Sequence, residues 1–254
     1  MEAGAGLAKG IGLSLDENAA RGNAARKLPD VQALPSPMPG VRLWWCALHA
    51  TESELRSYAG VLSAGEHARA ARFGSVLLRD RYVIGRAALR TVLGETLRLA
   101  PAEVAIVRGP RGRPRLDSDA ALDFNISHTH DIALLGVLAG AVDARIGVDI
   151  ERGDRRINVR GIARKFLGAN EREALATLDD EHARRAVLTL WTCKEAMSKA
   201  TGDALSAPFA SIDVDLRHGR RLRDGPGKYR PAGWSLHPAG VPGAYIATVA
   251  IWRA

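Results

Sequence analysis

Cysteine is almost absent from this chain. The two that occur, Cys46 and Cys193, lie far apart and form no C-x-x-C pair. We therefore expect neither a disulfide framework nor a cysteine-based zinc site, and two isolated thiols are compatible with a reducing, cytoplasmic location.

Long apolar runs are also missing. No stretch reaches the 18 apolar residues of a membrane span, and the first thirty residues lack the basic segment and apolar core of a secretory signal. We therefore expect no membrane partner and no secretion. The composition that remains is ordinary for a globular protein, 46% hydrophobic and 25% charged over 254 residues, which allows one large domain or two small ones.

The net charge of +8 is concentrated in one segment. Residues 69–115 contain eleven arginines and three acids, which is also +8, so this segment carries the whole excess. Such a patch attracts a polyanion, which can be a nucleic acid, a phosphorylated cofactor, an acidic protein or a membrane surface. A solvated basic face without a ligand is the plainer alternative.

The segment ends in the stretch PRGRPR, residues 110–115, which matches the core of an AT-hook. AT-hooks are flexible arms that fold in the minor groove of DNA, whereas this stretch lies between two strand-like runs. Gly112 allows the backbone to turn and Pro114 stiffens the exit. Nucleic-acid binding by the arginine-rich segment is the alternative function, and a plain basic hairpin stays open. The favoured interpretation is a tight loop that presents three arginines to a small anion: Arg111, Arg113 and Arg115.

Hydrophobic periodicity and turn residues predict an alternation of strands and helices after residue 40. The residues before that point, 1–40, are rich in Gly, Ala and Pro and are interpreted as a flexible N-terminal extension. Helices are expected near 51–58, 65–72, 76–99, 157–166, 169–178 and 181–200, and strands at 41–48, 103–109, 122–127, 132–140, 144–152, 211–216, 233–238 and 244–252.

The two halves of this region, 41–142 and 143–254, repeat one coarse plan of strands and helices. The expected fold class is therefore α+β, with two similar lobes and a cleft where they meet.

Two acidic motifs occur in the second half. GVDIER places Asp149 and Glu151 two residues apart on a strand, so both carboxylates point to one face and need a cation between them. WTCKEAMSKATG places Glu195 on a helix with Lys199 four residues later on the same face. Three such carboxylates suit Mg²⁺ completed by phosphate oxygens. An exposed strand end and a surface ion pair worth about 0.3–0.5 kcal/mol are the alternatives.

The stretch NISHTHD supplies Ser127, His128, His130 and Asp131. A hydrolytic triad stays open, although no G-x-S-x-G elbow accompanies it, as does a metal pair of the two histidines. The more economical interpretation is that His128 donates a hydrogen bond to a phosphate.

Taken in order, RGRPR, FNISH, GVDIE and WTCKEAMSKATG resemble the motifs of the larger, pseudo-dimeric 4′-phosphopantetheinyl transferases, over about residues 41–252. The resemblance implies two similar lobes, each a small, mainly antiparallel sheet packed with helices, and an active site in the cleft between them. It also implies transfer of 4′-phosphopantetheine from coenzyme A to a serine of an apo carrier protein, with Mg²⁺ as cofactor and adenosine 3′,5′-bisphosphate as product. The implied partners are carrier domains of polyketide, nonribosomal peptide or fatty-acid synthases, and a monomer suffices.

The same resemblance implies roles for single residues. Asp149, Glu151 and Glu195 match the Mg²⁺-coordinating acids. Glu195 also matches the proposed general base and Lys199 the lysine that contacts the pyrophosphate, so Asp149, Glu195 and Lys199 are the expected catalytic residues. The first lobe would bind the coenzyme A phosphates, while the second would hold the metal and dock the carrier. The matches expected to touch coenzyme A, besides Lys199, are Arg69, Arg111, Gly112, Arg113, Pro114, Ser127 and His128.

One position departs from the family pattern. Where a second basic residue often stands, three residues before Arg69, this chain has Glu66. The predicted helix 76–99 carries arginines that can replace it. Arg86 is expected to reach the ligand, from the face that it shares with Arg79 and Arg90 and opposite to Arg81.

Overall fold

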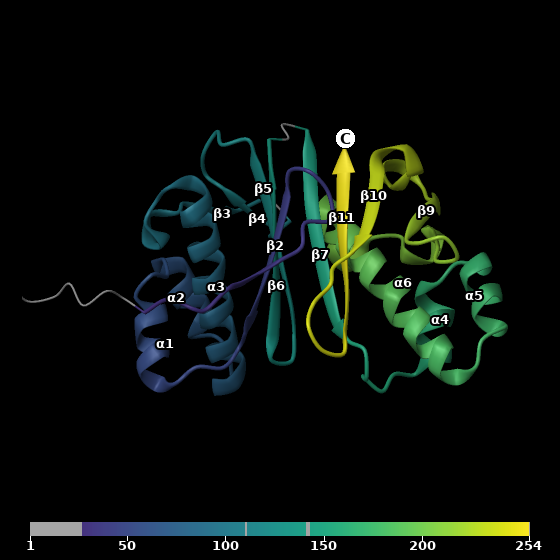
Figure 1. Ribbon diagram of the computed structural model, residues 1–254, viewed down its shortest axis with the longest axis horizontal. Helices are drawn as coiled ribbons and strands as arrows, with labels where there is room; N and C mark the ends of the chain where they lie inside the picture. Colours follow the sequence, from purple (N-terminus) through teal and green to yellow (C-terminus); the bar gives the residue numbers. More distant parts are fainter. Residues whose placement is uncertain (1–26, 110, 141–142, 254) are drawn as a thin grey trace, which may run out of the picture.

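The structure, a computed structural model, describes residues 27–109, 111–140 and 143–253. Figure 1 shows one group of helices on the left, strands in the middle and a second group of helices on the right. The layers therefore run helix, sheet, sheet, helix, and the fold is α+β with two lobes, as predicted.

The N-terminal lobe is built on a four-stranded antiparallel sheet in the order β1–β2–β6–β5, with β3 and β4 as a separate pair. Three helices cover its outer face. The elements are β1 (Gln32–Leu34), β2 (Val41–Ala47), α1 (Glu52–Ala59), α2 (Ala64–Ala70), α3 (Val76–Leu97), β3 (Ile106–Arg108), β4 (Pro114–Leu116), β5 (Leu122–Thr129) and β6 (Ile132–Ala139).

The C-terminal lobe has a three-stranded antiparallel sheet, β10–β11–β7, and the small pair β8–β9. Its elements are β7 (Ala144–Arg152), α4 (Val159–Phe166), α5 (Ala169–Ala176), α6 (Asp180–Thr201), β8 (Asp213–Asp215), β9 (Arg221–Asp224), β10 (Trp234–Pro238) and β11 (Tyr245–Arg253).

Helix starts follow from capping side chains. Thr51 and Ser63 each form a capping box with a glutamate three residues later, and Ser75 and Asp179 cap the two long helices. α4 starts at Val159, later than predicted, because Asn158 is its capping residue.

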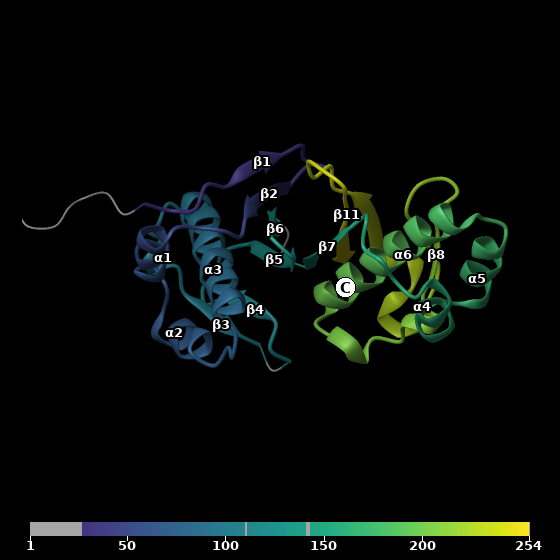
Figure 2. The same cartoon turned by 90° about the horizontal axis from the view of Figure 1, so that it is seen from below.

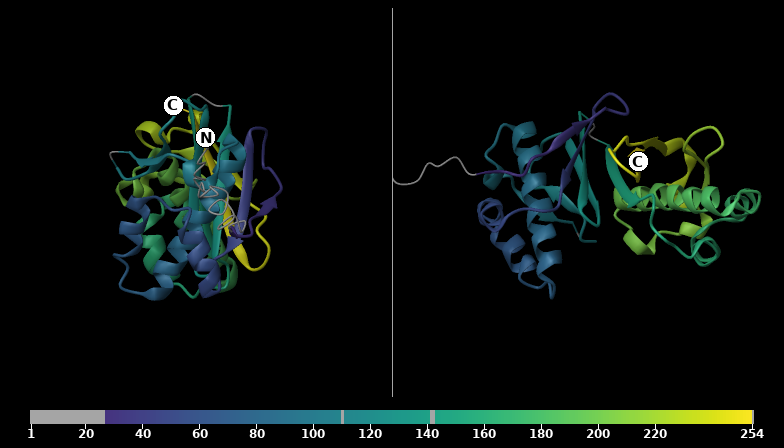
Figure 3. Two further views of the ribbon diagram at one scale, coloured as in Figure 1. Left: turned by 90° about the vertical axis from the view of Figure 1, so that its left-hand side faces the viewer. Right: turned by 60° about the horizontal axis from the view of Figure 1, so that its bottom comes forward.

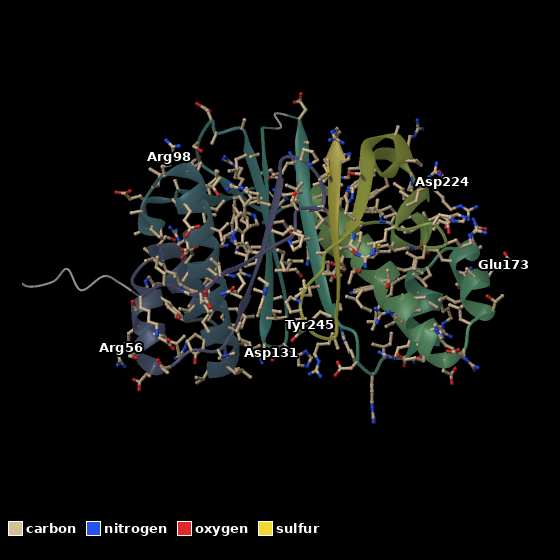
Figure 4. The ribbon with its side chains drawn as sticks, in the orientation of Figure 1. Arg56, Arg98, Asp131, Glu173, Asp224 and Tyr245 are labelled. Carbon is tan, nitrogen blue, oxygen red and sulfur yellow. The ribbon has the colours of Figure 1, made fainter. Side chains whose placement is uncertain are left out.

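Three apolar clusters hold the layers together. One lies under α1–α3 and one under α4–α6. The third joins the lobes, since Leu134 of β6 and Val148 of β7 are both fully buried in it. Figure 2 and the right-hand view of Figure 3 show α3 and α6 on the outer sides of the two sheets. Figure 4 shows Asp131 and Tyr245 close together at one end of this junction, where the Tyr245 hydroxyl donates to Asp131 at 3.1 Å.

Gly147 sets how closely α6 lies on β7. A Cβ atom at this position would stand 1.9 Å from the carbonyl oxygen of Ala196. Only glycine allows this approach, and it brings the helix face with Glu195 and Lys199 over the strand that carries Asp149.

The predicted flexible extension 1–40 is wrong in its last part. Residues 32–34 form β1, which pairs with β2, and the Lys27 amine bonds Glu54 at 2.6 Å. Residues 1–26 lie outside the described residues. Strands β1, β4 and β9 are too short for periodicity to reveal and were not predicted. In the described part of the chain, no helix is long and apolar enough to cross a membrane.

Candidate functional site

A cleft of about 760 Å³ lies between the two lobes. The N-terminal wall comes from α2, the first turns of α3, the β3–β4 turn and the end of β5. The C-terminal wall comes from the end of β7 and the last turn of α6. Eight Arg and Lys side chains line it: Arg69, Arg81, Arg86, Arg108, Arg111, Arg113, Arg155 and Lys199.

At the base of the cleft, β5 of one sheet lies beside β7 of the other. Every second side chain of β5 forms a hydrogen bond to β7. These side-chain bonds take the place of the backbone hydrogen bonds that would join the two strands in a continuous sheet. These bonds form a side-chain seam: Asp123 Oδ2 accepts from the Ile146 amide (2.8 Å), Asn125 Oδ1 from the Val148 amide (3.1 Å), Ser127 Oγ donates to Asp149 Oδ1 (2.9 Å) and Thr129 Oγ1 to Glu151 Oε2 (3.3 Å).

The seam brings three of the predicted residues together. Lys199 Nζ donates to Asp149 Oδ1 at 2.6 Å and to Ser127 Oγ at 2.8 Å. Asp149 and Ser127 are buried, while Lys199 lines the cleft. The cation of Lys199 is therefore held at the cleft wall by an anion behind it.

Glu195 lies one helical turn before Lys199 and is half-buried. Burial, followed by the negative charges of Asp149 and Glu151, raises the pKa of Glu195, and the positive charge of Lys199 opposes the shift. The three predicted acids are thus close enough to interact electrostatically. Glu151 itself accepts from Arg155 at 2.9 Å.

The three acids Asp149, Glu151 and Glu195 differ from a preformed metal site in geometry but not in donor chemistry. Among the described residues, no three His, Cys, Asp or Glu side chains stand ready as a metal-binding cluster. Asp149 Oδ2 is nevertheless buried without a hydrogen-bond partner, and the negative charges of Asp149 and Glu151 add to burial in raising the pKa of Glu195. All donors are oxygens, which a hard cation prefers. The residues therefore fit a divalent cation in charge and donor chemistry.

The β3–β4 turn lies across the cleft from α6. Gly112 has a φ of +80°, as the predicted turn requires. Arg111 is exposed and forms an ion pair with Asp203 of the other lobe. Arg113 is directed inward and donates to Asp123 and to backbone carbonyls. Pro114 opens β4 and lines the cleft.

His128 and Arg69 stand at the cleft wall as predicted. Loss of surrounding water, followed by the positive charges of Lys199 and Arg81, lowers the pKa of His128. The imidazole is therefore mainly neutral at pH 7. The Arg69 guanidinium lies 5.9 Å from the Tyr82 ring centroid, a distance typical of a cation–π contact.

The arginines of α3 differ in the partners that they have within the protein. Arg86 donates to Glu66 Oε1 at 2.7 and 2.5 Å, and Arg90 donates to Oε2 at 2.7 Å. Arg86 borders the cleft, and it shares the single negative charge of Glu66 with Arg90. Arg81 lines the cleft, and its buried Nε has no hydrogen-bond partner, so this donor is available to a ligand.

Several residues of the site gave no recognised signal in the sequence. Asp123 and Asn125 hold the seam, and Arg155 lines the cleft. Lys194, beside Glu195, is fully buried and donates to Glu171 at 2.6 Å and to three carbonyls. Within one helical motif, Lys194 therefore supports the fold, Lys199 lines the cleft, and the half-buried Glu195 lies one turn before Lys199 outside the cleft lining.

Comparison with known proteins agrees with this geometry. The family model described as the 4′-phosphopantetheinyl transferase superfamily matches residues 145–250, and the model for the 4′-phosphopantetheinyl transferase N-terminal region matches residues 46–141. The 4′-phosphopantetheinyl transferase HetI of Nostoc sp. is 36% identical over 179 residues, which cover 69% of this chain and 74% of that protein. The 4′-phosphopantetheinyl transferase ffp of Bacillus subtilis is 28% identical over 173 residues, covering 68% and 74%.

Among solved structures, a holo-(acyl-carrier-protein) synthase from Bacillus anthracis in complex with CoA (3′,5′-ADP) covers 43% of this chain and 96% of its own, with a TM-score of 0.36 and 22% identity. That score is too low to carry an argument about the fold. The matches named here give no support to the nucleic-acid-binding alternative. The chain belongs to the 4′-phosphopantetheinyl transferase superfamily and is an enzyme of its larger, two-lobed type, a family that transfers phosphopantetheine from coenzyme A to carrier proteins.

Proposed function

We propose that this enzyme transfers 4′-phosphopantetheine to a serine of apo carrier domains in a Mg²⁺-dependent reaction and releases adenosine 3′,5′-bisphosphate. The observation that carries the proposal is the convergence of Lys199, Ser127 and Asp149 at the base of an arginine-lined cleft. A volume of about 760 Å³ lies in the range of cofactor-sized ligand sites.

Coenzyme A would lie in the cleft with its phosphates on the N-terminal lobe. Arg69 and Arg81 supply charge at that wall, and His128 supplies a neutral hydrogen-bond donor. Lys199, at the opposite wall, would contact the pyrophosphate. We assign residues 41–142 to phosphate binding and 143–254 to the metal and the carrier.

The chemistry is an attack by the carrier serine oxygen on the phosphorus that bears pantetheine. A bond forms from the serine oxygen to phosphorus, and the bond from phosphorus to the oxygen of the departing nucleotide breaks. Lys199 stabilises the negative charge that builds on the pyrophosphate oxygens. The serine proton passes to a base, and Glu195 is the candidate because its raised pKa favours proton acceptance.

Asp149, Glu151 and Glu195 would hold Mg²⁺, whose contribution when bound is to neutralise charge on the pyrophosphate. Asp149 also orients Lys199 and Ser127 through its Oδ1 atom. One carboxylate oxygen thus holds both the Lys199 amine at the cleft wall and the buried hydroxyl of Ser127.

The carrier would dock on α4 and the segment before it. Arg155 of this segment lines the cleft. Five exposed cations lie along the segment and α4: Arg155, Arg156, Arg160, Arg164 and Lys165. An acidic carrier surface is complementary to them. Leu167, which follows α4, is fully buried and therefore cannot form part of this docking surface. We further propose a monomer, since one chain contains both walls of the cleft, and a cytoplasmic location, since both cysteines are free. Carriers of polyketide, nonribosomal peptide and fatty-acid synthases are the candidate substrates.

Intact-mass spectrometry tests the function directly. Apo carrier proteins of the three synthase types are incubated with the enzyme, coenzyme A and Mg²⁺, with an EDTA control. We expect a gain of one phosphopantetheine that disappears with EDTA. No gain on any carrier would refute transfer, and a gain that persists in EDTA would refute the metal requirement.

A further inference from the structure

Arg113 joins the two lobes through an extensive set of hydrogen bonds. It leaves the β3–β4 turn, and its side chain is only 12% exposed. Its Nη1 and Nη2 atoms donate to the two carboxylate oxygens of Asp123 at 2.8 and 2.7 Å. Nη2 also donates to the Ile146 carbonyl at 2.8 Å, and Nε donates to the Lys199 carbonyl at 2.8 Å.

These bonds leave little donor capacity for a ligand. A guanidinium has five N–H donors. The four bonds above are all shorter than 3 Å, and a further bond from Nη1 reaches the Pro114 carbonyl at 3.5 Å. Arg111, two residues earlier, is by contrast 65% exposed. The two arginines of the turn therefore have different environments, and a phosphate could bind to Arg113 only after protein bonds break.

The bond to Lys199 is made at the end of a helix. The last carbonyls of an α-helix lack partners within the helix, and Lys199 lies two residues before the end of α6. A cation placed there also interacts favourably with the helix dipole. Arg113 thus caps α6 from the opposite lobe, through the residue whose side chain contacts Asp149 and Ser127.

The second anchor is on β7. Asp123, which holds both terminal nitrogens of Arg113, also accepts from the Ile146 amide at 2.8 Å. Ile146 lies three residues before Asp149 on the same strand. The Arg113–Asp123 pair therefore ties the end of α6 and the strand of Asp149 to the edge of β5.

We propose that Arg113, although it borders the cleft, is a positioning residue that fixes Lys199 and Asp149 against Ser127, and that its guanidinium donates no hydrogen bond to coenzyme A. The inference rests on the proposed role of Lys199 in transfer. It changes the assignment implied by the motif, which placed Arg113 among the coenzyme A contacts. Loss of Arg113 would shift the catalytic lysine relative to the pyrophosphate while the phosphate-binding wall stays in place.

The test compares Arg113→Met and Arg113→Lys with Arg56→Met. Arg56 is an exposed arginine of α1 that pairs with Glu52 at 2.7 Å and does not line the cleft, and its variant should behave as the wild type. Titration calorimetry gives the Kd of coenzyme A, and transfer to an apo carrier gives kcat and KM. We expect Arg113→Met to lower kcat by about 100-fold, because small misplacements of reacting groups cost that much, while Kd changes less than about threefold. Arg113→Lys keeps the positive charge but loses the planar guanidinium with its two terminal nitrogens, so its kcat should lie between those of the wild type and Arg113→Met.

A double-variant cycle separates positioning from general loss of stability. If Arg113 acts through Lys199, Arg113→Met should lower kcat little further in an enzyme that already carries Lys199→Met. Full additivity, after correction for the folded fraction from thermal unfolding, would overturn the proposal. So would a tenfold rise in the Kd of coenzyme A with kcat unchanged. If Arg113→Met does not fold, Arg113→Lys takes its place in the same double-variant cycle with Lys199→Met.

Failure of the proposed function would be visible separately. Wild-type enzyme that transfers nothing to any carrier would refute the function. The Kd of coenzyme A for the wild type and Arg113→Met would still report whether Arg113 touches the ligand, and a tenfold difference would refute the inference on its own.

Discussion

Lys199 Nζ and Asp149 Oδ1 lie 2.6 Å apart, joined across the packing of α6 on β7. Asp149 is buried and its second carboxylate oxygen has no partner. The pair therefore combines a fixed cation at the cleft wall with an available carboxylate oxygen behind it, which is the arrangement that a phosphate-transferring site requires.

Removal of the Asp149 charge should abolish transfer without unfolding the protein. Asp149→Asn keeps the shape of the side chain but loses the anion that holds Lys199 and would help to hold Mg²⁺. We expect a decrease of at least about 100-fold in kcat, the usual cost of one electrostatic group in an active site. The control is Asp154→Asn, because Asp154 is exposed and pairs with Arg152 outside the cleft lining. Near-normal transfer by Asp149→Asn would contradict the site assignment.

Substitutions at two neighbouring residues of α6 should affect different properties: Lys194→Met should lower stability, and Glu195→Gln should lower transfer. Lys194→Met leaves Glu171 as a buried, unpaired acid, so unfolding free energy should fall by about 3–5 kcal/mol. Glu195→Gln removes a charge that burial already disfavours, so stability should be kept while transfer is lost. Urea unfolding and transfer per folded molecule distinguish the two, and transfer retained by Glu195→Gln would exclude Glu195 as the base.

Arg81 should contribute to coenzyme A binding and Arg79 should not. Arg81 lines the cleft with an unpartnered Nε, whereas Arg79 is paired with Asp80 at 2.9 Å and does not line the cleft. A lost charge-assisted hydrogen bond to phosphate should raise the Kd of Arg81→Met about tenfold or more. Calorimetry with coenzyme A measures both variants. Equal Kd values for the two variants would mean that another basic residue, and not Arg81, binds the coenzyme A phosphate.

The buried Glu66 should make stability depend on pH. Burial opposes ionisation, but the charges of Arg86 and Arg90 and a bond from the Ser63 amide outweigh it and lower the pKa of Glu66 below 4.5. Its stabilising effect is therefore complete above pH 4.5 and is lost as the pH falls through the lower, folded value.

Glu66→Gln tests this dependence. At pH 7 it leaves the two arginines without their anion and should cost about 3–5 kcal/mol of unfolding free energy. The difference from the wild type should shrink as the pH falls below 4.5. Urea unfolding at several pH values measures it, and a difference that does not change with pH would mean that Glu66 is not ionised in the folded protein.

Much of the site could be predicted from local sequence. The period of two in a strand places Asp149 and Glu151 on one face, and the spacing of four in a helix aligns Glu195 with Lys199. Helix starts followed from Thr51, Ser63 and Asp179, which satisfy free amides within three residues of themselves. These features depend on neighbours in the chain, so the sequence contains them directly.

Contacts between distant segments could not be predicted in the same way. Nothing local distinguishes Arg81 from Arg86, because the partner of Arg86 is Glu66 on another helix. The bonds of Arg113 to Asp123 and to the end of α6 could not be predicted either, because its motif says nothing of these partners. β1 was missed because three residues form a strand only when β2 offers its edge.

The sequence by itself thus determined the chemical groups of this enzyme, the elements that carry them and the faces on which they lie. The tertiary structure alone decided which charges remain available to a ligand. Glu66 neutralises Arg86, Asp123 holds Arg113, and Asp149 orients Lys199. The physical reason is that a charge pairs with the nearest opposite charge in space, and that neighbour is set by the packing of α6 on β7 and of one lobe on the other.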